Sequence, residues 1–300
     1  MTNDSGSSEI AYGEIIDTYI NLPAAERRTD MDPNIERWFG GKSPDLLGGV
    51  GPDRVVDRMD NAGVQMGLLN VSLGADSIEN PHVGGYGGVM SIDDFRASCQ
   101  RAADAVREYP DRFRGSCNID PTQGMNAVRM VEMAVNEFDF RTIRVMGALV
   151  NMPPNHPLMY PIYTKCIELG IPIVVNVGVP GPLRFAKYQR PMDLDEVLVT
   201  YPELTVVATH IGHPWHVETV AMLQKHANFY LMTSGFSPKY VPDEVVHLMN
   251  TRGRERVMWA SDYAILTFER AVEDGLALQL REGVQRRYMR ENALAVFNWD

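Results

Sequence analysis

Eight short apolar runs recur along the chain, with helix-like segments between them. The predicted strands are 15–20, 65–71, 114–119, 142–146, 171–177, 204–210, 229–233 and 257–261. Several are apolar almost throughout, which is typical of strands buried on both faces of a parallel sheet. The predicted helices are 53–62, 91–109, 123–137, 157–169, 193–200, 216–226, 242–251 and 266–281. Eight alternating β/α units favour one α/β domain, a (β/α)8 TIM barrel, over two separate domains.

The length of the chain fits this architecture. It has 300 residues, and such a barrel needs ~250. We expect a flexible N-terminus over 1–10 and one barrel domain over 11–300. Two insertions, 22–52 and 72–90, follow the first two predicted strands and therefore lie at the carboxyl end of the barrel, where active sites are built. The glycine run 84–88 within the second insertion is predicted to form a flexible lid.

Composition and charge narrow the class of partner. The net charge of −11 and the pI of about 5.1 disfavour nucleic acid and anionic membranes, since both need a basic surface. The three cysteines are scattered and form no Cys-x-x-Cys, so we expect buried free thiols. No signal peptide and no long apolar run is seen, which indicates a cytoplasmic protein that acts on a small molecule.

Two predicted strands end on one ionisable residue each. The run 204–210 ends on His210, and Asp262 follows the run 257–261. A parallel barrel presents catalytic groups at such strand ends. Imidazole suits acid/base work or polarising a carbonyl near pH 7, and a carboxylate can act as a general base. We therefore predict that His210 and Asp262 are catalytic, with a buried structural histidine and a helix N-cap as the alternatives.

Further polar residues interrupt or follow apolar runs. Arg144 lies inside the run 142–146, where it forms either an ion pair within the barrel or a clamp for a substrate carboxylate or carbonyl. Arg184, after the fifth predicted strand, is a second candidate on the same reasoning. Asn176, Tyr19 and Asn21 lie near strand ends, where buried polar groups must be hydrogen-bonded.

Three histidines follow the sixth predicted strand, His210, His213 and His216. Their spacing resembles a metal site, but a His-Pro-Trp turn need not bring them to one point, so we do not predict a metal there. We expect His213 to contact substrate.

Several motifs in order along 15–297 resemble the amidohydrolase superfamily. The group most similar to this chain contains aminocarboxymuconate-semialdehyde decarboxylase-like enzymes and pyrone-dicarboxylate lactonases. The motifs are Ile16-Asp17, Pro161-Ile-Tyr163, Gly170-Ile-Pro172, Tyr201-Pro-Glu-Leu204, His210-Ile-Gly212, Asn228-Phe-Tyr230-Leu, Thr233-Ser234, Ser261-Asp262-Tyr263 and Glu291-Asn-Ala-Leu-Ala-Val-Phe297. The resemblance implies the barrel, its pocket and a homodimer.

The metal motif of that family is altered in this chain. The family opens with Asp-x-His-x-His, or with Glu in place of the first His, where this chain has Asp17-Thr-Tyr19-Ile-Asn21. The fifth-strand histidine of the family is replaced by Asn176, while His210 and Asp262 are kept. Phenol and amide are poor substitutes for imidazole as zinc ligands. We therefore expect no resident cofactor, although the resemblance alone would imply a divalent metal.

These observations predict a metal-independent hydrolase or lyase that acts on a small activated ring, such as a lactone, a carboxylated compound or a 1,3-dicarbonyl. Asp262 is the general base and His210 the polarising or acid group. Two alternatives are kept: a metal-dependent decarboxylase of a carboxylated aromatic or muconate-type substrate, and a ligand-binding barrel without catalysis.

Overall fold

The computed structural model describes residues 9–23, 25–27, 33–39, 43–71, 91–181 and 184–299. The glycine run 84–88 and most of the predicted flexible N-terminus lie outside these residues, so both stay predictions. None of the described helices has the length and apolar character that crossing a membrane requires. The cytoplasmic location and the homodimer also stay predictions.

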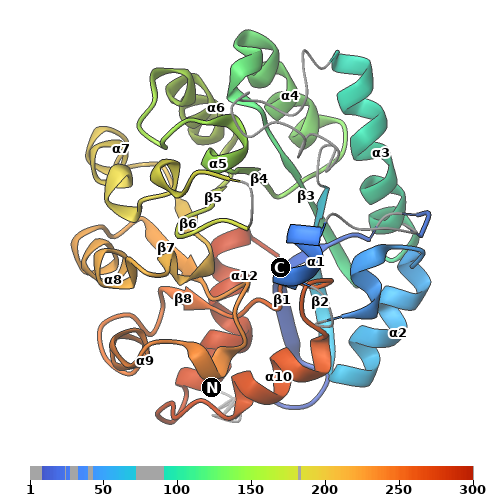
Figure 1. Cartoon of the computed structure of the whole chain (residues 1–300), viewed down its shortest axis with the longest axis vertical. Coiled ribbons are helices and arrows are strands. Elements are labelled where there is room, and N and C mark those ends of the chain that lie inside the picture. The colour runs from blue at the N-terminus through green and yellow to red at the C-terminus, as the bar shows by residue number, and fades with distance from the viewer. Residues whose placement is uncertain are drawn as a thin grey trace, which may run out of the picture.

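Eight parallel strands form one sheet that closes into a barrel (Figure 1). The strands are β1 (Ile15–Asn21), β2 (Val64–Val71), β3 (Phe113–Asn118), β4 (Thr142–Val145), β5 (Ile173–Val175), β6 (Val206–Ala208), β7 (Phe229–Met232) and β8 (Val257–Met258). Each strand pairs with the next in chain order. A parallel bridge between Ile20 on β1 and Tyr263 just past β8 closes the ring. The predicted (β/α)8 barrel is confirmed.

Helices surround the barrel. They are α1 (Pro33–Phe39), α2 (Pro52–Ala62), α3 (Ile92–Glu108), α4 (Met125–Asn136), α5 (Gly147–Val150), α6 (Tyr160–Leu169), α7 (Leu194–Thr200), α8 (His216–Lys225), α9 (Asp243–Met249), α10 (Phe268–Leu276), α11 (Val284–Arg286) and α12 (Asn292–Phe297). All eight predicted helices are present. The short helices α1, α5, α11 and α12 were not among the predicted ones; α1 lies inside the insertion 22–52.

Local sequence signals set the ends of several helices. Ser91 caps α3, since its Oγ accepts a hydrogen bond from the Asp94 backbone N–H at 3.1 Å. The Asp94 carboxylate accepts one from the Ser91 backbone N–H in return, which completes a capping box. Helix α6 ends at Gly170, whose φ of 65° lies in the left-handed region that glycine adopts without strain.

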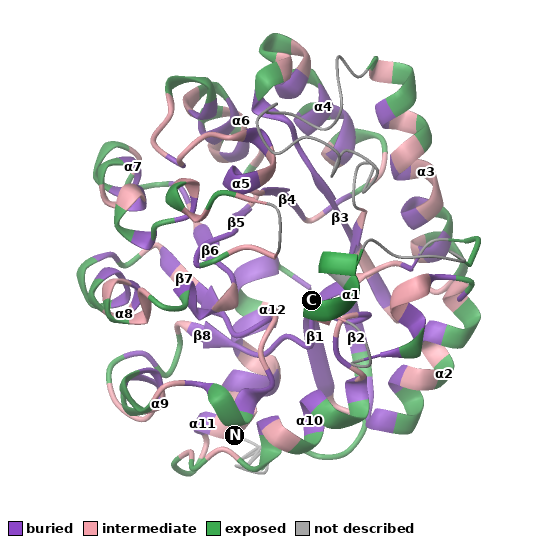
Figure 2. Cartoon of the chain, viewed as in Figure 1, coloured by how far each residue is buried: buried purple, intermediate pink, exposed green. Residues whose placement is uncertain are grey.

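The apolar core has two parts. One lies between the strands and the helices, which bury one face each and expose the other (Figure 2). It includes the three cysteines, which are free and buried as predicted. The other part fills the barrel interior, where Phe297 and Trp299 join side chains from the strands. Asn292, at the start of α12, donates to the Val257 carbonyl at the start of β8, so α12 closes the amino-terminal end of the barrel.

Removing the Phe297 side chain from this closure should lower stability by most of what a buried aromatic side chain contributes. Phe297 is 1% exposed and stacks on Trp299 with ring centroids 5.3 Å apart. We predict that Phe297→Ala lowers the free energy of unfolding by about 3–5 kcal/mol, measured by urea denaturation. The exposed Val199→Ala on α7 is the control and should change it by less than about 0.5 kcal/mol. Equal, small effects of the two changes would contradict this packing.

Candidate active site

One polar side chain stands at or just past the carboxyl end of each strand. In order around the sheet these are Asn21, Asn70, Asn118, Arg144, Asn176, His210, Ser234 and Asp262. The barrel interior beneath them is largely apolar. The active sites of α/β-barrel enzymes lie at this end, so this polar layer is the candidate site.

His210 is held by hydrogen bonds on both sides of its ring. Its Nε2 lies 2.9 Å from Asn176 Nδ2, and its Nδ1 lies 3.0 Å from Ser234 Oγ and 3.9 Å from Asp262 Oδ2. Because the Asn176 amide nitrogen can only donate, Nε2 accepts and the ring proton sits on Nδ1. Burial lowers the pKa of His210, and the Arg144 charge lowers it further, against the opposing effect of Asp262. The imidazole is therefore neutral at pH 7.

Asp262 is buried beside this ring. Its Oδ1 accepts a hydrogen bond from Asn21 Nδ2 at 2.7 Å. The backbone φ is 59° at Asp262 and 57° at His210, a left-handed conformation that non-glycine residues adopt only where the surroundings enforce it. The helix-cap alternative is excluded, because Thr267 caps α10. Both predicted catalytic residues thus sit at sharply turned strand ends and face each other.

Arg144 brings a buried positive charge to the site. Its guanidinium carbon lies 4.2 Å from the centroid of the Tyr19 ring, and its Nη2 contacts Met146 Sδ at 2.9 Å. Its Nε and Nη1 are buried and make no hydrogen bond to any described residue. Burial lowers the pKa of Arg144 to about 10, with Asp262 opposing the shift, so the side chain stays charged at pH 7. A buried cation with free donors is a binding site for an anionic or carbonyl oxygen.

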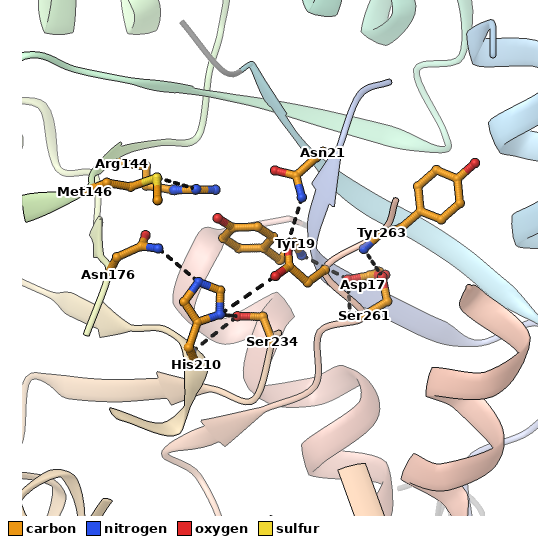
Figure 3. A network of polar contacts seen from close by, with 11 residues as sticks. Asp17, Tyr19, Asn21, Arg144, Met146, Asn176, His210, Ser234, Ser261 and Tyr263 are labelled. Atoms are coloured by element: carbon orange, nitrogen blue, oxygen red, sulfur yellow. Dashed lines mark hydrogen bonds and ion pairs between the residues drawn. The ribbon is translucent and has the colours of Figure 1, made fainter. Parts of the chain in front are cut away.

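Tyr19 lies between the guanidinium and the imidazole. Its ring meets the His210 ring edge-on, with centroids 5.7 Å apart, and carries Arg144 on its face. The close view shows Tyr19, Asn21, Arg144 and Asn176 around His210 (Figure 3). The structure therefore brings together six of the eight predicted site residues, counting His210 and Asp262.

Asp17 lies beneath this group and ties β1 to the turn after β8. Its carboxyl group contacts the Ser261 hydroxyl and accepts hydrogen bonds from the backbone N–H groups of Ser261, at 3.1 Å, and Tyr19, at 2.9 Å. Complete burial raises the pKa of Asp17 to about 8, although these hydrogen bonds oppose the shift. Asp17 is therefore mostly protonated at pH 7 and adds little charge to the site.

Two predicted site residues lie outside this group. Arg184 lies in the loop after β5, outside the polar layer at the strand ends. His213 is exposed; its ring packs on Phe236 at 5.5 Å and lies parallel to the His216 ring at 6.5 Å. Substrate contacts by these two residues stay predictions.

Sequence reasoning missed three members of the layer. Ser234 was quoted only as part of a motif, although its hydroxyl orients the His210 ring. Asn70 and Asn118 each interrupt a predicted strand with a polar side chain, the same signal that singled out Arg144. That signal could have found both asparagines.

The charges and donors of the layer do not suit a divalent metal. No group of three or more His, Cys, Asp or Glu that could hold a metal ion occurs in the described part of the chain. The Nε2 of His210 and an oxygen of Asp262 are already engaged by Asn176 and Asn21. The single charge of Asp262 is balanced by Arg144, so a divalent cation would add two uncompensated charges to a buried pocket.

Comparison with known proteins shows the family to which the chain belongs. A closed eight-stranded barrel with ionisable side chains at its carboxyl end is the architecture of an α/β-barrel enzyme. The amidohydrolase family model matches residues 47–299, and the chain belongs to this family. No curated protein sequence matches it.

Solved structures share the fold at low identity. An uncharacterized TIM-barrel protein, Bb4693, from Bordetella bronchiseptica is 21% identical over 95% of this chain and 98% of its own, with a TM-score of 0.74. The 5-carboxyvanillate decarboxylase LigW from Sphingomonas paucimobilis is 19% identical over 95% and 99%, with a TM-score of 0.70. A dihydroxybenzoic acid decarboxylase from Polaromonas sp. JS666, solved with manganese and 2-nitroresorcinol, is 18% identical over 95% and 97%, with a TM-score of 0.67. Decarboxylases correspond better to the first alternative of the sequence analysis, a metal-dependent decarboxylase, than to its main prediction of a metal-independent hydrolase or lyase.

The raised pKa of Asp17 makes stability depend on pH. The folded protein keeps a proton that the unfolded chain releases above its ordinary pKa of 3.8, so Asp17 lowers the free energy of unfolding as pH rises towards about 8. We predict that Asp17→Asn, which cannot titrate, gains stability relative to the wild type between about pH 5 and pH 8, measured by urea denaturation. The exposed Asp57→Asn should leave the pH dependence unchanged. A stability difference that stays constant with pH would show that Asp17 is ionised when folded.

Proposed function

We propose that this chain is a carboxy-lyase that removes CO2 from a small carboxylated ring compound without a divalent metal. The observation that carries the proposal is Arg144, a buried guanidinium close to Asp262 and His210 whose Nε and Nη1 have no hydrogen-bond partner among the described residues. The decarboxylase names of two solved structures with this fold support the choice of reaction.

Binding of a substrate anion sets up the proton transfer. Arg144 Nε and Nη1 bind an anionic oxygen of the substrate, and the Tyr19 ring beneath the guanidinium holds that side chain in place. Before substrate binds, the charges of Arg144 and Asp262 oppose each other. A bound anion leaves one negative charge in excess, and a proton taken up with the substrate balances it.

Asp262 then acts as the proton donor. Its proton passes to the ring carbon that bears the carboxylate, the bond from that carbon to the carboxylate breaks, and the electron pair of the bond restores the ring as CO2 departs. The Asp262 carboxylate that remains is held by Asn21 and faces the Nδ1–H of His210. The product is the ring with hydrogen where the carboxylate was, so atoms and charge balance.

A second candidate, hydrolysis of a lactone, uses the same groups. The observation in its favour is the Asp262 carboxylate beside a neutral imidazole, an arrangement suited to activating water as a general base. Arg144 would polarise the carbonyl oxygen. The two reactions differ in their products, which makes them easy to separate.

Mass spectrometry of products formed in D2O distinguishes them. We expect 2,6-dihydroxybenzoate or 5-carboxyvanillate to lose CO2 and to gain one deuterium at the vacated carbon. Addition of water to 2-pyrone-4,6-dicarboxylate, with no CO2 released from either aromatic acid, would support the lactonase and contradict the carboxy-lyase.

Two substitutions separate binding from chemistry. Asp262→Asn keeps the shape of the side chain but loses the transferable proton, and should lower kcat by at least about 10²-fold with little change in KM. Arg144→Met should raise KM by about 10- to 100-fold, the effect of losing a hydrogen bond to a charged group. Arg114→Met on β3, whose guanidinium bonds the Pro110 carbonyl, is the control and should change neither. Equal loss of activity in Arg114→Met and Arg144→Met would contradict the assignment.

Manganese should not stabilise the wild-type protein. We predict less than about one manganese per ten chains after purification, by elemental analysis, and no change in Tm when manganese is added to chelator-treated protein. A ligand present at 100 times its Kd would add about 2.7 kcal/mol of stability, so binding would be visible. Arg144→Met, which removes the competing charge, should respond more to manganese than the wild type. A stoichiometric metal that raises the wild-type Tm would contradict metal independence.

A further inference from the structure

Two buried asparagines on β2 and β3 have amide atoms with no hydrogen-bond partner among the described residues. Asn118 is 0% exposed, and neither its Nδ2 nor its Oδ1 bonds to any described residue. Asn70 is 3% exposed, and its Nδ2 is likewise without a partner in the described ranges, while its Oδ1 lies 3.4 Å from Ser116 Oγ. Buried amides are almost always hydrogen-bonded, so these two call for an explanation.

The register of the sheet places Asn118 next to Arg144, and Asn70 one strand further along the same inner face. Asn118 on β3 pairs with Arg144 on β4, and residues paired across parallel strands share one face of the sheet. Arg144 faces the barrel interior, where it covers the Tyr19 ring. Asn70 pairs with Ser116, which lies two residues before Asn118 and therefore on the same face. Asn70, Asn118 and Arg144 thus form a continuous strip on the inner wall.

The chemistry of the strip defines its ligand. The amide nitrogen and the amide oxygen of Asn118 both lack a partner in the described ranges, and the Asn70 amide nitrogen adds a second donor group. A carboxylate can only accept, and an ammonium can only donate. A hydroxyl group both donates and accepts, so it matches the Asn118 amide with a single oxygen.

We propose that Asn118, with Asn70, is a recognition subsite for a hydroxyl group on the substrate, beside the anion bound at Arg144. The proposal rests on the proposed function only in placing the substrate in this pocket. It makes Asn118 a specificity-determining residue, and the substrate a ring that carries a hydroxyl group as well as a carboxylate.

Calorimetric binding of simple probes tests the proposal. The carboxylate probes are benzoate, the three monohydroxybenzoates and the methoxy analogue of the hydroxybenzoate that binds best. The affinities for phenol and fluorobenzene are compared in the same way. We expect the wild type to bind one hydroxybenzoate about tenfold more tightly than benzoate, the effect of one hydrogen bond, and the methoxy analogue to lose this gain. Asn118→Leu should bind benzoate as the wild type does and should show no hydroxyl preference.

The control is Asn228→Leu, which removes an asparagine from the opposite end of the barrel, where its Nδ2 bonds the carbonyls of Tyr201 and Leu204. This change should lower Tm and leave the hydroxyl preference intact. Asn118→Leu should not lower Tm, because replacing an unpaired buried amide by an apolar group of similar size is neutral or stabilising. A loss of stability in Asn118→Leu would show that the amide is already satisfied, by a buried water or by the rest of the chain, and would overturn the proposal.

The remaining outcomes separate this proposal from the proposed function. A hydroxyl preference that survives in Asn118→Leu, or no preference among any of the probes, overturns the subsite. Loss of the preference in Asn118→Leu, together with benzoate binding that is insensitive to Arg144→Met, supports the subsite and counts against the proposed anion site. A preference for phenol over fluorobenzene that needs Asn118 supports the subsite even if no carboxylate binds.

Discussion

The chemistry of this pocket depends on the buried guanidinium of Arg144. It lies on the Tyr19 ring, two of its donor groups have no partner in the described part of the chain, and Asp262 provides the opposing charge. Burial and this cation together lower the pKa of His210, which leaves the imidazole neutral and able to accept from Asn176. In many barrel enzymes a metal ion supplies the positive charge that binds and polarises substrate. Here a side chain supplies it, and a divalent ion would have to share the pocket with that side chain.

The barrel places these groups by closing β1 against β8. Asp17 contacts the Ser261 hydroxyl and backbone across this seam, and a bridge from Ile20 to Tyr263 completes the sheet. Beyond the seam the backbone turns through a left-handed conformation at Asp262, as it also does at His210. The surrounding packing holds the backbone of both residues in this strained conformation. Such backbone strain is concentrated at functional sites. The two catalytic candidates therefore owe their proximity to strands that are far apart in the sequence.

Much of the fold and five of the eight members of the polar layer could be predicted from single residues. Apolar runs located all eight strands, and a polar residue within or after such a run found Arg144, His210 and Asp262. The choice between a clamp and an ion pair at Arg144 could not be made, because it depends on what the neighbouring strands bring within reach. Whether residues in connecting loops, such as Arg184 and His213, reach the site was harder to predict, because no local sequence signal fixes the course of a loop. The protonation of Asp17 was beyond sequence reasoning because it follows from complete burial.

Whether Arg144 takes the place of a metal is the central question, and carboxylate binding to metal-stripped protein answers it most directly. Calorimetric titration of 2,6-dihydroxybenzoate into the wild type, after exhaustive chelation and again after manganese is restored, measures the Kd in both states. We predict the same Kd within about twofold in the two states, because Arg144 supplies the positive charge that binds the carboxylate with or without manganese (a factor of two is about 0.4 kcal/mol). Binding that disappears on chelation and returns with manganese would contradict it.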